Sequence, residues 1–249
     1  MTIVGTGYVG LTTGAVLAYL GNQVTCVDID QDKISALRAG CLPLCEPGLP
    51  ELIRAARGAL EFTTSLPPAV RSAELIFIAV GTPPGPGGEA DLSAVRAAAQ
   101  GIGEQLNGNY QVIVTKSTVP VGCGNWVEML VRDHYAHCNG GDPPNASVTS
   151  NPEFLREGSA IHDSLYPDRI VVGCDDPRAL QLVQRLYEPI LGQSFSPPEV
   201  APRPVNYAPP LLVTTDLTSA EAIKYAANAF LALKISFINE IAGLCEKVG

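Results

Sequence analysis

A glycine-rich segment near the N-terminus offers the clearest chemistry in the sequence. Gly5-Thr6-Gly7-Tyr8-Val9-Gly10 has the pattern G-x-G-x-x-G, follows the apolar pair Ile3-Val4 and opens an apolar helical stretch. In that setting the first glycine permits a tight turn, the second lets the backbone approach a pyrophosphate, and the third lets helix and strand pack closely. The N-terminal N–H groups of the helix then attract phosphate oxygens. The segment therefore predicts a dinucleotide-binding loop.

Asp28 indicates which dinucleotide this loop would hold. It ends the next apolar run, Gln23–Val27, and lies 18 residues after Gly10. A carboxylate at this place accepts hydrogen bonds from the 2′-hydroxyl of a ribose and repels a 2′-phosphate. No arginine follows it directly, so NAD is favoured over NADP. The alternative is a glycine-rich turn with a helix-capping aspartate, but the agreement of strand, spacing and acid favours the dinucleotide site.

The residues around this loop alternate between strand-like and helix-like patterns. The expected strands lie near 3–4, 23–27, 75–80 and 112–115, and the expected helices near 11–20, 32–39, 49–57, 92–106 and 124–137. Short, unbroken apolar strands that alternate with helices predict an α/β fold, a Rossmann-like doubly wound parallel sheet covered on both faces. We expect this NAD-binding domain to span 1–216. It includes a proline-rich excursion at 196–210, after which 211–214 resumes a strand-like run.

A long helix follows this domain. Thr218-Ser219-Ala220-Glu221 has the hydroxyl-to-carboxylate spacing of a capping box, which predicts a helix start there. From that point alanine, isoleucine, leucine and phenylalanine dominate as far as Cys245, on more than one helix face. We expect 217–249 to be a long central helix that begins a truncated dimerisation and substrate domain. It would be buried against the remainder of the protein or a second subunit.

Composition argues against several classes of partner. The net charge of −9 disfavours nucleic-acid binding, which needs clustered lysine and arginine. We expect no membrane span, because no run of about 18 apolar residues occurs, and no secretory signal. Seven cysteines without a C-x-x-C pair indicate a reducing, cytoplasmic location. His134 and His137 could share a helix face, but no third ligand accompanies them, so we expect no metal site.

Beyond these patterns, a series of motifs resembles the UDP-glucose/GDP-mannose dehydrogenase family. The series begins with the glycine-rich loop and keeps the family's order over nearly the whole chain. Its other members are Val80-Gly81-Thr82-Pro83, Lys116-Ser117-Thr118-Val119-Pro120-Val121-Gly122, Asn151-Pro152-Glu153-Phe154-Leu155-Arg156-Glu157-Gly158, Tyr166-Pro167-Asp168-Arg169-Ile170-Val171-Val172-Gly173 and Ala222-Ile223-Lys224-Tyr225-Ala226-Ala227-Asn228-Ala229-Phe230-Leu231. Arg156-Glu157-Gly158 and Pro167-Asp168-Arg169 resemble the UDP-glucose branch of the family more than the GDP-mannose or N-acetylmannosamine branches.

The resemblance implies a set of functional residues. For NAD it implies Gly5, Gly7, Tyr8, Val9, Gly10, Asp28, Lys33, Thr82, Thr118 and Glu157, and for UDP-glucose it implies Glu153, Phe154, Leu155, Arg156, Glu157, Lys224 and Asn228. The implied catalytic residues are Thr118, Glu153, Glu157, Lys224 and Asn228, with Thr118 helping to hold a catalytic water. Without the resemblance, Thr82 and Thr118 would be interpreted as hydroxyls that stabilise turns and caps.

Two of these pairs also have a physical interpretation of their own. Glu153 and Glu157 are four residues apart, so a helix would place both carboxylates on one side for acid–base work. The alternative is a solvated first helical turn. Lys224 and Asn228 have the same spacing, which predicts a shared polar cavity where they stabilise an oxyanion. A lysine at a rim beside a capping asparagine is the alternative, although asparagine is unfavourable inside a helix.

The activity implied by the resemblance is the NAD-dependent, four-electron oxidation of UDP-glucose to UDP-glucuronate, by a homodimer, for polysaccharide biosynthesis. A cysteine thiolate holds the intermediate as a thioester, which water hydrolyses. The family's motif ending Cys-Phe-Pro-Lys-Asp does not occur here, and Cys245 lacks its glycine-rich surroundings. We therefore expect residues 1–249 to bind NAD without turnover. A related dehydrogenase of GDP-mannose or UDP-N-acetylmannosamine and a non-catalytic NAD-binding module are the alternatives.

Overall fold

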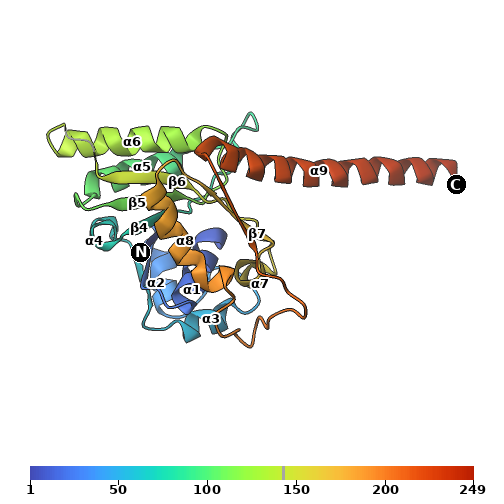
Figure 1. Cartoon of the computed structure of the whole chain (residues 1–249). Helices are drawn as coiled ribbons and strands as arrows, with labels where there is room; N and C mark the ends of the chain where they lie inside the picture. Colours follow the sequence, from blue (N-terminus) through green and yellow to red (C-terminus); the bar gives the residue numbers. More distant parts are fainter. Residues whose placement is uncertain (142–143) are drawn as a thin grey trace.

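An eight-stranded sheet forms the centre of the structure, a computed structural model that describes residues 1–141 and 144–249 (Figure 1). The strands are β1 (Thr2–Val4), β2 (Val24–Val27), β3 (Leu60–Thr63), β4 (Leu75–Ile78), β5 (Gln111–Thr115), β6 (Ala146–Ser150), β7 (Arg169–Gly173) and β8 (Leu211–Thr215). They are ordered β3-β2-β1-β4-β5-β6-β7-β8. Neighbours from β3 to β6 are parallel, whereas β7 is antiparallel to β6 and parallel to β8. The predicted Rossmann-like sheet is confirmed, with its last two strands reversed.

Helices cover both faces of the sheet (Figure 1). They are α1 (Tyr8–Tyr19), α2 (Gln31–Arg38), α3 (Leu49–Ala55), α4 (Leu66–Ser72), α5 (Ser93–Gln105), α6 (Cys123–Cys138), α7 (Ala160–Leu165), α8 (Pro177–Leu191) and α9 (Leu217–Val248). One face packs against α4, α5 and α6. The other packs against α1 and α8, while α2, α3 and α7 pack against the outer side of α1.

The central strands read as unbroken apolar runs because both of their faces are buried. Successive side chains of a strand point to opposite faces. Ile3 and Phe77 accordingly join the core under α1 and α8, whereas Val4 and Ile78 join the core under α4, α5 and α6. This two-sided burial is the physical basis of the doubly wound prediction.

The strands and helices predicted for the first 140 residues are all present, with bounds shifted by a few residues. The strand-like run at 211–214 is confirmed as β8, and the proline-rich excursion at 196–210 holds no helix or strand. Six elements were not predicted from the sequence, namely β3, α4, β6, α7, β7 and α8.

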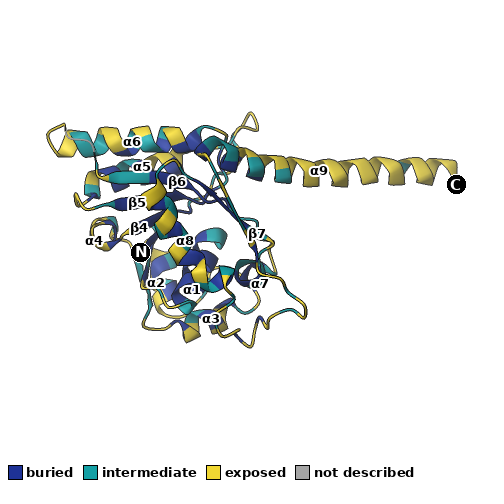
Figure 2. Ribbon diagram, in the orientation of Figure 1, coloured by how far each residue is buried: buried dark blue, intermediate teal, exposed yellow. Residues whose placement is uncertain are grey.

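The predicted long helix is confirmed as α9, which projects away from the sheet (Figure 2). Only its first turns are buried, through Leu217, Ala220, Glu221 and Lys224. Large apolar side chains beyond them are exposed, namely Phe230, Leu231, Leu233, Ile235, Phe237, Ile238, Ile241, Leu244 and Val248. The helix therefore presents an apolar surface that the described part of the chain does not cover.

This apolarity bears on the expectation that the chain does not span a membrane. By length and composition alone α9 could cross one, since its most apolar stretch has a mean hydropathy of 1.3. The core helices of soluble proteins meet the same criterion. The absence of a membrane span therefore stays a prediction.

The start of α9 corrects the predicted capping box. Asp216 is the N-cap, and its carboxylate accepts a hydrogen bond from the Ser219 backbone N–H at 2.8 Å. Glu221 does not reach back to this end of its own helix. Its carboxylate instead accepts hydrogen bonds from the backbone N–H groups of Gly122 and Gly124, each at 2.6 Å, at the start of α6. The Glu221 carboxylate thus joins α9 to the start of α6.

Candidate functional site

The glycine-rich loop connects β1 to α1, and the structure requires glycine at two of its positions. Gly5 has φ +101°, and a Cβ there would lie 2.6 Å from the Ala79 carbonyl oxygen. A Cβ on Gly10 would lie 2.0 Å from the carbonyl oxygen of Gly5. Added side chains would therefore push β1, β4 and α1 apart. A Cβ on Gly7 would instead meet open space.

The N-terminus of α1 fits a pyrophosphate. Gly7 is its N-cap, no side chain caps the first turn, and no acidic residue lies in that turn. The first N–H groups of a helix have no partner within it and carry partial positive charge. The open space at Gly7 leaves room for an anion to reach these groups.

Asp28, directly after β2, lies against this loop. Its Oδ2 atom accepts hydrogen bonds from the Thr6 backbone N–H at 2.9 Å and from the Thr6 hydroxyl at 2.6 Å, and Lys33 Nζ lies 3.0 Å away. Oδ1 accepts a bond from the Asp30 backbone N–H. Burial alone would raise the pKa of Asp28, but these bonds outweigh it and lower the pKa below its usual range. The carboxylate is therefore a charged acceptor beside the loop.

Thr82 and Thr118 meet at the carboxyl ends of β4 and β5. The Thr82 hydroxyl donates to the Thr118 carbonyl oxygen at 2.8 Å. Ser117 ties the same two segments together, since its hydroxyl donates to the Val80 carbonyl oxygen at 2.7 Å. Ligands of open parallel sheets bind at this edge. Both threonines are thus held where a dinucleotide would pass.

The segment 151–158 corrects one expectation, because it is not helical. Proline at 152 disfavours the helical conformation for Asn151. Glu153 accepts a hydrogen bond from the Leu155 backbone N–H at 2.5 Å and turns inward. Glu157 is exposed, so the two carboxylates do not share a helix face.

Glu153 instead forms an ion pair with Lys224 of α9. Its Oε1 atom lies 3.0 Å from Lys224 Nζ, and the two side chains are only 11% and 8% exposed. The ammonium also lies 5.2 Å from the centre of the Phe154 ring. A pair this buried interacts more strongly than a surface pair because water screens it little. Asn228, one turn further along α9, is exposed.

A cavity of about 740 Å³ lies against this ion pair. Six of the predicted substrate-binding residues line it, namely Glu153, Phe154, Leu155, Arg156, Lys224 and Asn228. Lys224 and Asn228 therefore do face one cavity. Glu157 and Thr118 do not belong to its lining. The volume is of the size that holds a small-molecule ligand.

Lys116 and Asn151 are buried residues that line this cavity, and neither was among the predicted site residues. Lys116 Nζ lies 3.2 Å from the Asn151 side-chain oxygen, which also accepts a hydrogen bond from the Tyr187 hydroxyl at 2.6 Å. Burial lowers the pKa of Lys116 to about 8, with the Glu153 charge opposing that shift and the Lys224 charge adding to it. Both residues lie in motifs that carry the family resemblance, but the local sequence does not indicate that their side chains are buried.

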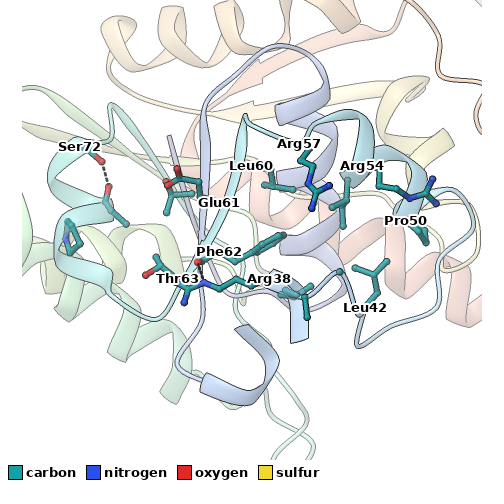
Figure 3. Close-up of a pocket in the computed structure, with 17 residues that line it drawn as sticks. Arg38, Leu42, Pro50, Arg54, Arg57, Leu60, Glu61, Phe62, Thr63 and Ser72 are labelled. Carbon is teal, nitrogen blue, oxygen red and sulfur yellow. Dashed lines mark hydrogen bonds between the residues drawn. The ribbon is translucent and has the colours of Figure 1, made fainter. Parts of the chain in front are cut away.

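A second cavity, of about 780 Å³, lies at the other edge of the sheet (Figure 3). Figure 3 shows Arg38, Arg54 and Arg57 around Leu60 and Phe62 of β3. None of the predicted site residues lines it. It is therefore separate from the site that the motifs indicate.

The described residues also bear on metals and thiols. Within 1–141 and 144–249, no group of three or more His, Cys, Asp or Glu side chains could hold a metal ion. His134 lies 3.3 Å from Glu104. Cys245 is a free thiol on the exposed part of α9. The absence of a metal stays a prediction.

Comparison with known proteins assigns this arrangement to a family. Residues 1–191 match the model of the UDP-glucose/GDP-mannose dehydrogenase family, NAD binding domain, and residues 218–249 match the central domain of that family. The chain belongs to the UDP-glucose/GDP-mannose dehydrogenase family. The predicted resemblance and the predicted cofactor, NAD, are confirmed by these matches.

Members of this family resemble the chain along its whole length. It is 47% identical over 251 residues to UDP-glucose 6-dehydrogenase TuaD of Bacillus subtilis and 51% identical over 257 residues to UDP-glucose 6-dehydrogenase of Rhizobium meliloti. The chain is covered completely in both matches, but it covers only 49% and 53% of those proteins. It therefore spans about half the length of the relatives that it matches.

Solved structures of the family share the fold. A UDP-glucose dehydrogenase from Pyrobaculum islandicum superimposes with a TM-score of 0.83 at 39% identity. A GDP-mannose dehydrogenase from Pseudomonas aeruginosa superimposes with a TM-score of 0.82 at 31% identity. Each match covers 96% of this chain and 51% of the other. The arrangement of sheet and long helix is thus that of nucleotide-sugar dehydrogenases.

Proposed function

We propose that the complete protein oxidises UDP-glucose to UDP-glucuronate with NAD. The observation that carries the proposal is a contact between the two halves of the site. Arg156 lines the cavity, and its carbonyl oxygen lies 3.3 Å from the hydroxyl of Tyr8 in the dinucleotide loop. A sugar in the cavity then lies beside a cofactor bound along the sheet edge. The names of the similar enzymes from Bacillus subtilis and Rhizobium meliloti support UDP-glucose as the substrate.

In this proposal the dinucleotide loop and Asp28 hold the cofactor. NAD, when bound, supplies the hydride acceptor. Gly5, Gly7 and Gly10, with the N–H groups of Tyr8 and Val9, cradle the pyrophosphate. Asp28 accepts hydrogen bonds from a ribose, with Lys33 beside it, and Thr82, Thr118 and Glu157 complete the cofactor site. Residues 153–156, which line the cavity, hold the substrate together with Lys224 and Asn228.

The polar groups of α9 and of the cavity wall carry the chemistry. Lys224 and Asn228 stabilise the negative charge that develops on the oxygen of the reacting sugar carbon. Lys224 is held in place for this role by Glu153, its ion-pair partner. Thr118, with Glu153 or Glu157, orients the water that hydrolyses the thioester left after the second hydride has been transferred. Proton transfer by these side chains requires that bulk water be kept out of the pocket. The burial of the Glu153–Lys224 ion pair supports this part of the proposal.

The test is a panel of nucleotide sugars given to the complete protein. UDP-glucose should yield two NADH for each UDP-glucuronate formed, followed by NADH absorbance and product analysis. GDP-mannose and UDP-N-acetylmannosamine should turn over far more slowly. Preference for either of them would assign a related dehydrogenase. NAD binding without turnover of any sugar would assign a binding module.

A matched test uses the polypeptide of residues 1–249. It should bind NAD in a calorimetric titration and produce no sustained NADH with UDP-glucose, because no cysteine in it has the context of the family's nucleophile. Sustained NADH production that Cys245→Ser abolishes would contradict this expectation. The titration and the turnover assay are independent readouts of the two halves of the proposal.

The proposal also includes an oligomeric state, which rests on the exposed apolar side chains of α9. A second copy of the same helix could cover it, which gives a homodimer. We place the enzyme in the cytoplasm, where thiols stay reduced. Its product, a UDP-linked uronic acid, serves polysaccharide biosynthesis.

A further inference from the structure

A buried carboxylate outside the proposed catalytic set joins the two halves of the site. Glu46 lies in the loop between α2 and α3 and is only 3% exposed. Its Oε1 atom accepts a hydrogen bond from the Ala160 backbone N–H at 2.7 Å. Its Oε2 atom accepts bonds from the Gly158 backbone N–H at 2.8 Å and from the Tyr8 hydroxyl. Three segments that are distant in sequence thus meet on one side chain.

Tyr8 connects this carboxylate to the cofactor side. It is the first residue of α1, so its backbone belongs to the loop that would hold the pyrophosphate. Its hydroxyl also lies 3.3 Å from the Arg156 carbonyl oxygen and accepts a bond from the Gly158 N–H at 3.1 Å. Burial and, after it, the bond to Glu46 raise the pKa of Tyr8. The hydroxyl therefore stays protonated as a donor.

Gly158 and Ala160 connect the same carboxylate to the substrate side. Gly158 lies two residues after Arg156, which ends the consecutive cavity-lining residues 151–156, and it adopts φ +86°. Ala160 begins α7 and is fully buried. Glu46 therefore fixes the end of the segment that contributes Glu153 and Arg156 to the cavity.

We propose that Glu46 is a positioning residue that couples occupation of the dinucleotide loop to the geometry of the substrate segment 153–158. The connection runs from the backbone of Tyr8, through its hydroxyl, to Glu46 and on to the N–H groups of Gly158 and Ala160. A cofactor that orders the start of α1 orders the substrate segment as well, and by thermodynamic linkage the reverse holds. The inference rests on the proposed function, because it requires NAD in the loop.

Hydrogen exchange of the Gly158 and Ala160 amides tests the proposal, since both amides donate to Glu46. In the wild-type chain, saturating NAD should slow their exchange on the order of five-fold or more. Glu46→Gln should reduce that NAD-dependent slowing to less than about two-fold. If Glu46→Gln does not fold, Tyr8→Phe gives the same answer. It leaves both amide bonds to Glu46, so exchange without NAD stays slow while the NAD-dependent change is lost.

Glu221→Gln is the matched control. Glu221 is also a buried carboxylate that accepts two backbone N–H bonds, but these come from α6. This variant should lose stability and keep the NAD-dependent slowing at 158 and 160. A wild type that binds no NAD would overturn the proposed function and this inference with it. NAD binding with equal slowing in wild type, Glu46→Gln and Tyr8→Phe would overturn the inference alone.

Discussion

At the scale of single residues, the contacts of Asp28 predict how its removal affects NAD binding. Its carboxylate is charged and faces the loop, because bonds from Thr6 and Lys33 favour the ionised form. Asp28→Ala should weaken NAD binding by about 1.5–3 kcal/mol, the value of hydrogen bonds to a charged group. Calorimetric titration measures this loss. Asp30→Ala is the control, because Asp30 caps α2, and an equal loss in both variants would contradict the role of Asp28.

The position of Lys224 in the cavity predicts how its removal affects turnover by the complete enzyme. Lys224→Ala should lower kcat by about 100-fold or more, as expected for the loss of a group that stabilises an oxyanion. The KM for NAD should change little, because Lys224 lies on the cavity side of the site. Lys234→Ala, on the exposed part of the same helix, should leave kcat unchanged. A variant of Lys224 that impairs only NAD binding would rule out the proposed role.

The burial of Lys116 predicts how the free energy of unfolding depends on pH. Burial lowers its pKa in the folded protein from 10.5 to about 8, so the folded protein loses this proton before the unfolded chain does. Below this range the folded protein must bury a charged ammonium, which costs stability. The free energy of unfolding therefore rises as the pH increases from about 8 to 10.5 and this cost is removed. Across that window the free energy of unfolding of the wild type should gain about 3 kcal/mol over that of Lys116→Met. Urea unfolding at several pH values measures the difference, and a difference independent of pH would refute the assignment.

At the scale of elements, Glu221 carries the contact between α9 and α6. It accepts two N–H bonds at the start of α6 from within the first turns of α9. Glu221→Gln should leave one of these N–H groups without an acceptor and lower the free energy of unfolding by about 1–3 kcal/mol. Urea unfolding monitored by circular dichroism measures the loss. An unchanged midpoint would mean that the contact does not hold the two helices together.

The same scale explains why some elements could be predicted and others could not. The glycine-rich loop and the strands under it are specified by local spacing and by unbroken apolar runs, so their positions followed from the sequence. A signal for α8 was also present, since Asp176 caps it and Pro177 stands at its first position. The segment 151–158 gave the opposite result. Its acidic residues are spaced as in a helix, but the segment is not helical, and Glu153 pairs with Lys224 of α9.

At the scale of the whole molecule, α9 governs association. Its large apolar side chains are exposed beyond the first turns, for example Leu233 at 63% and Phe237 at 62%. Residues 1–249 should therefore self-associate, which sedimentation velocity at several concentrations measures. A double variant, Leu233→Glu with Phe237→Glu, should sediment as a monomer. The control, Lys234→Glu with Glu246→Lys, changes only charges on the helix, and a monomeric wild type would contradict the prediction.

The sequence by itself determined the dinucleotide loop, the carboxylate after β2, the layered α/β fold and the long apolar helix. Each of these depends on residues that are close in sequence or on a repeating apolar pattern. The tertiary structure alone decided that Lys224 pairs with Glu153, 71 residues away, and that Glu221 reaches α6 across 97 residues. It also decided that Glu46 is buried and accepts a hydrogen bond from the backbone N–H of Ala160, 114 residues away. Whether a carboxylate is solvated or buried against a particular donor depends on the packing of distant segments, which local spacing does not encode.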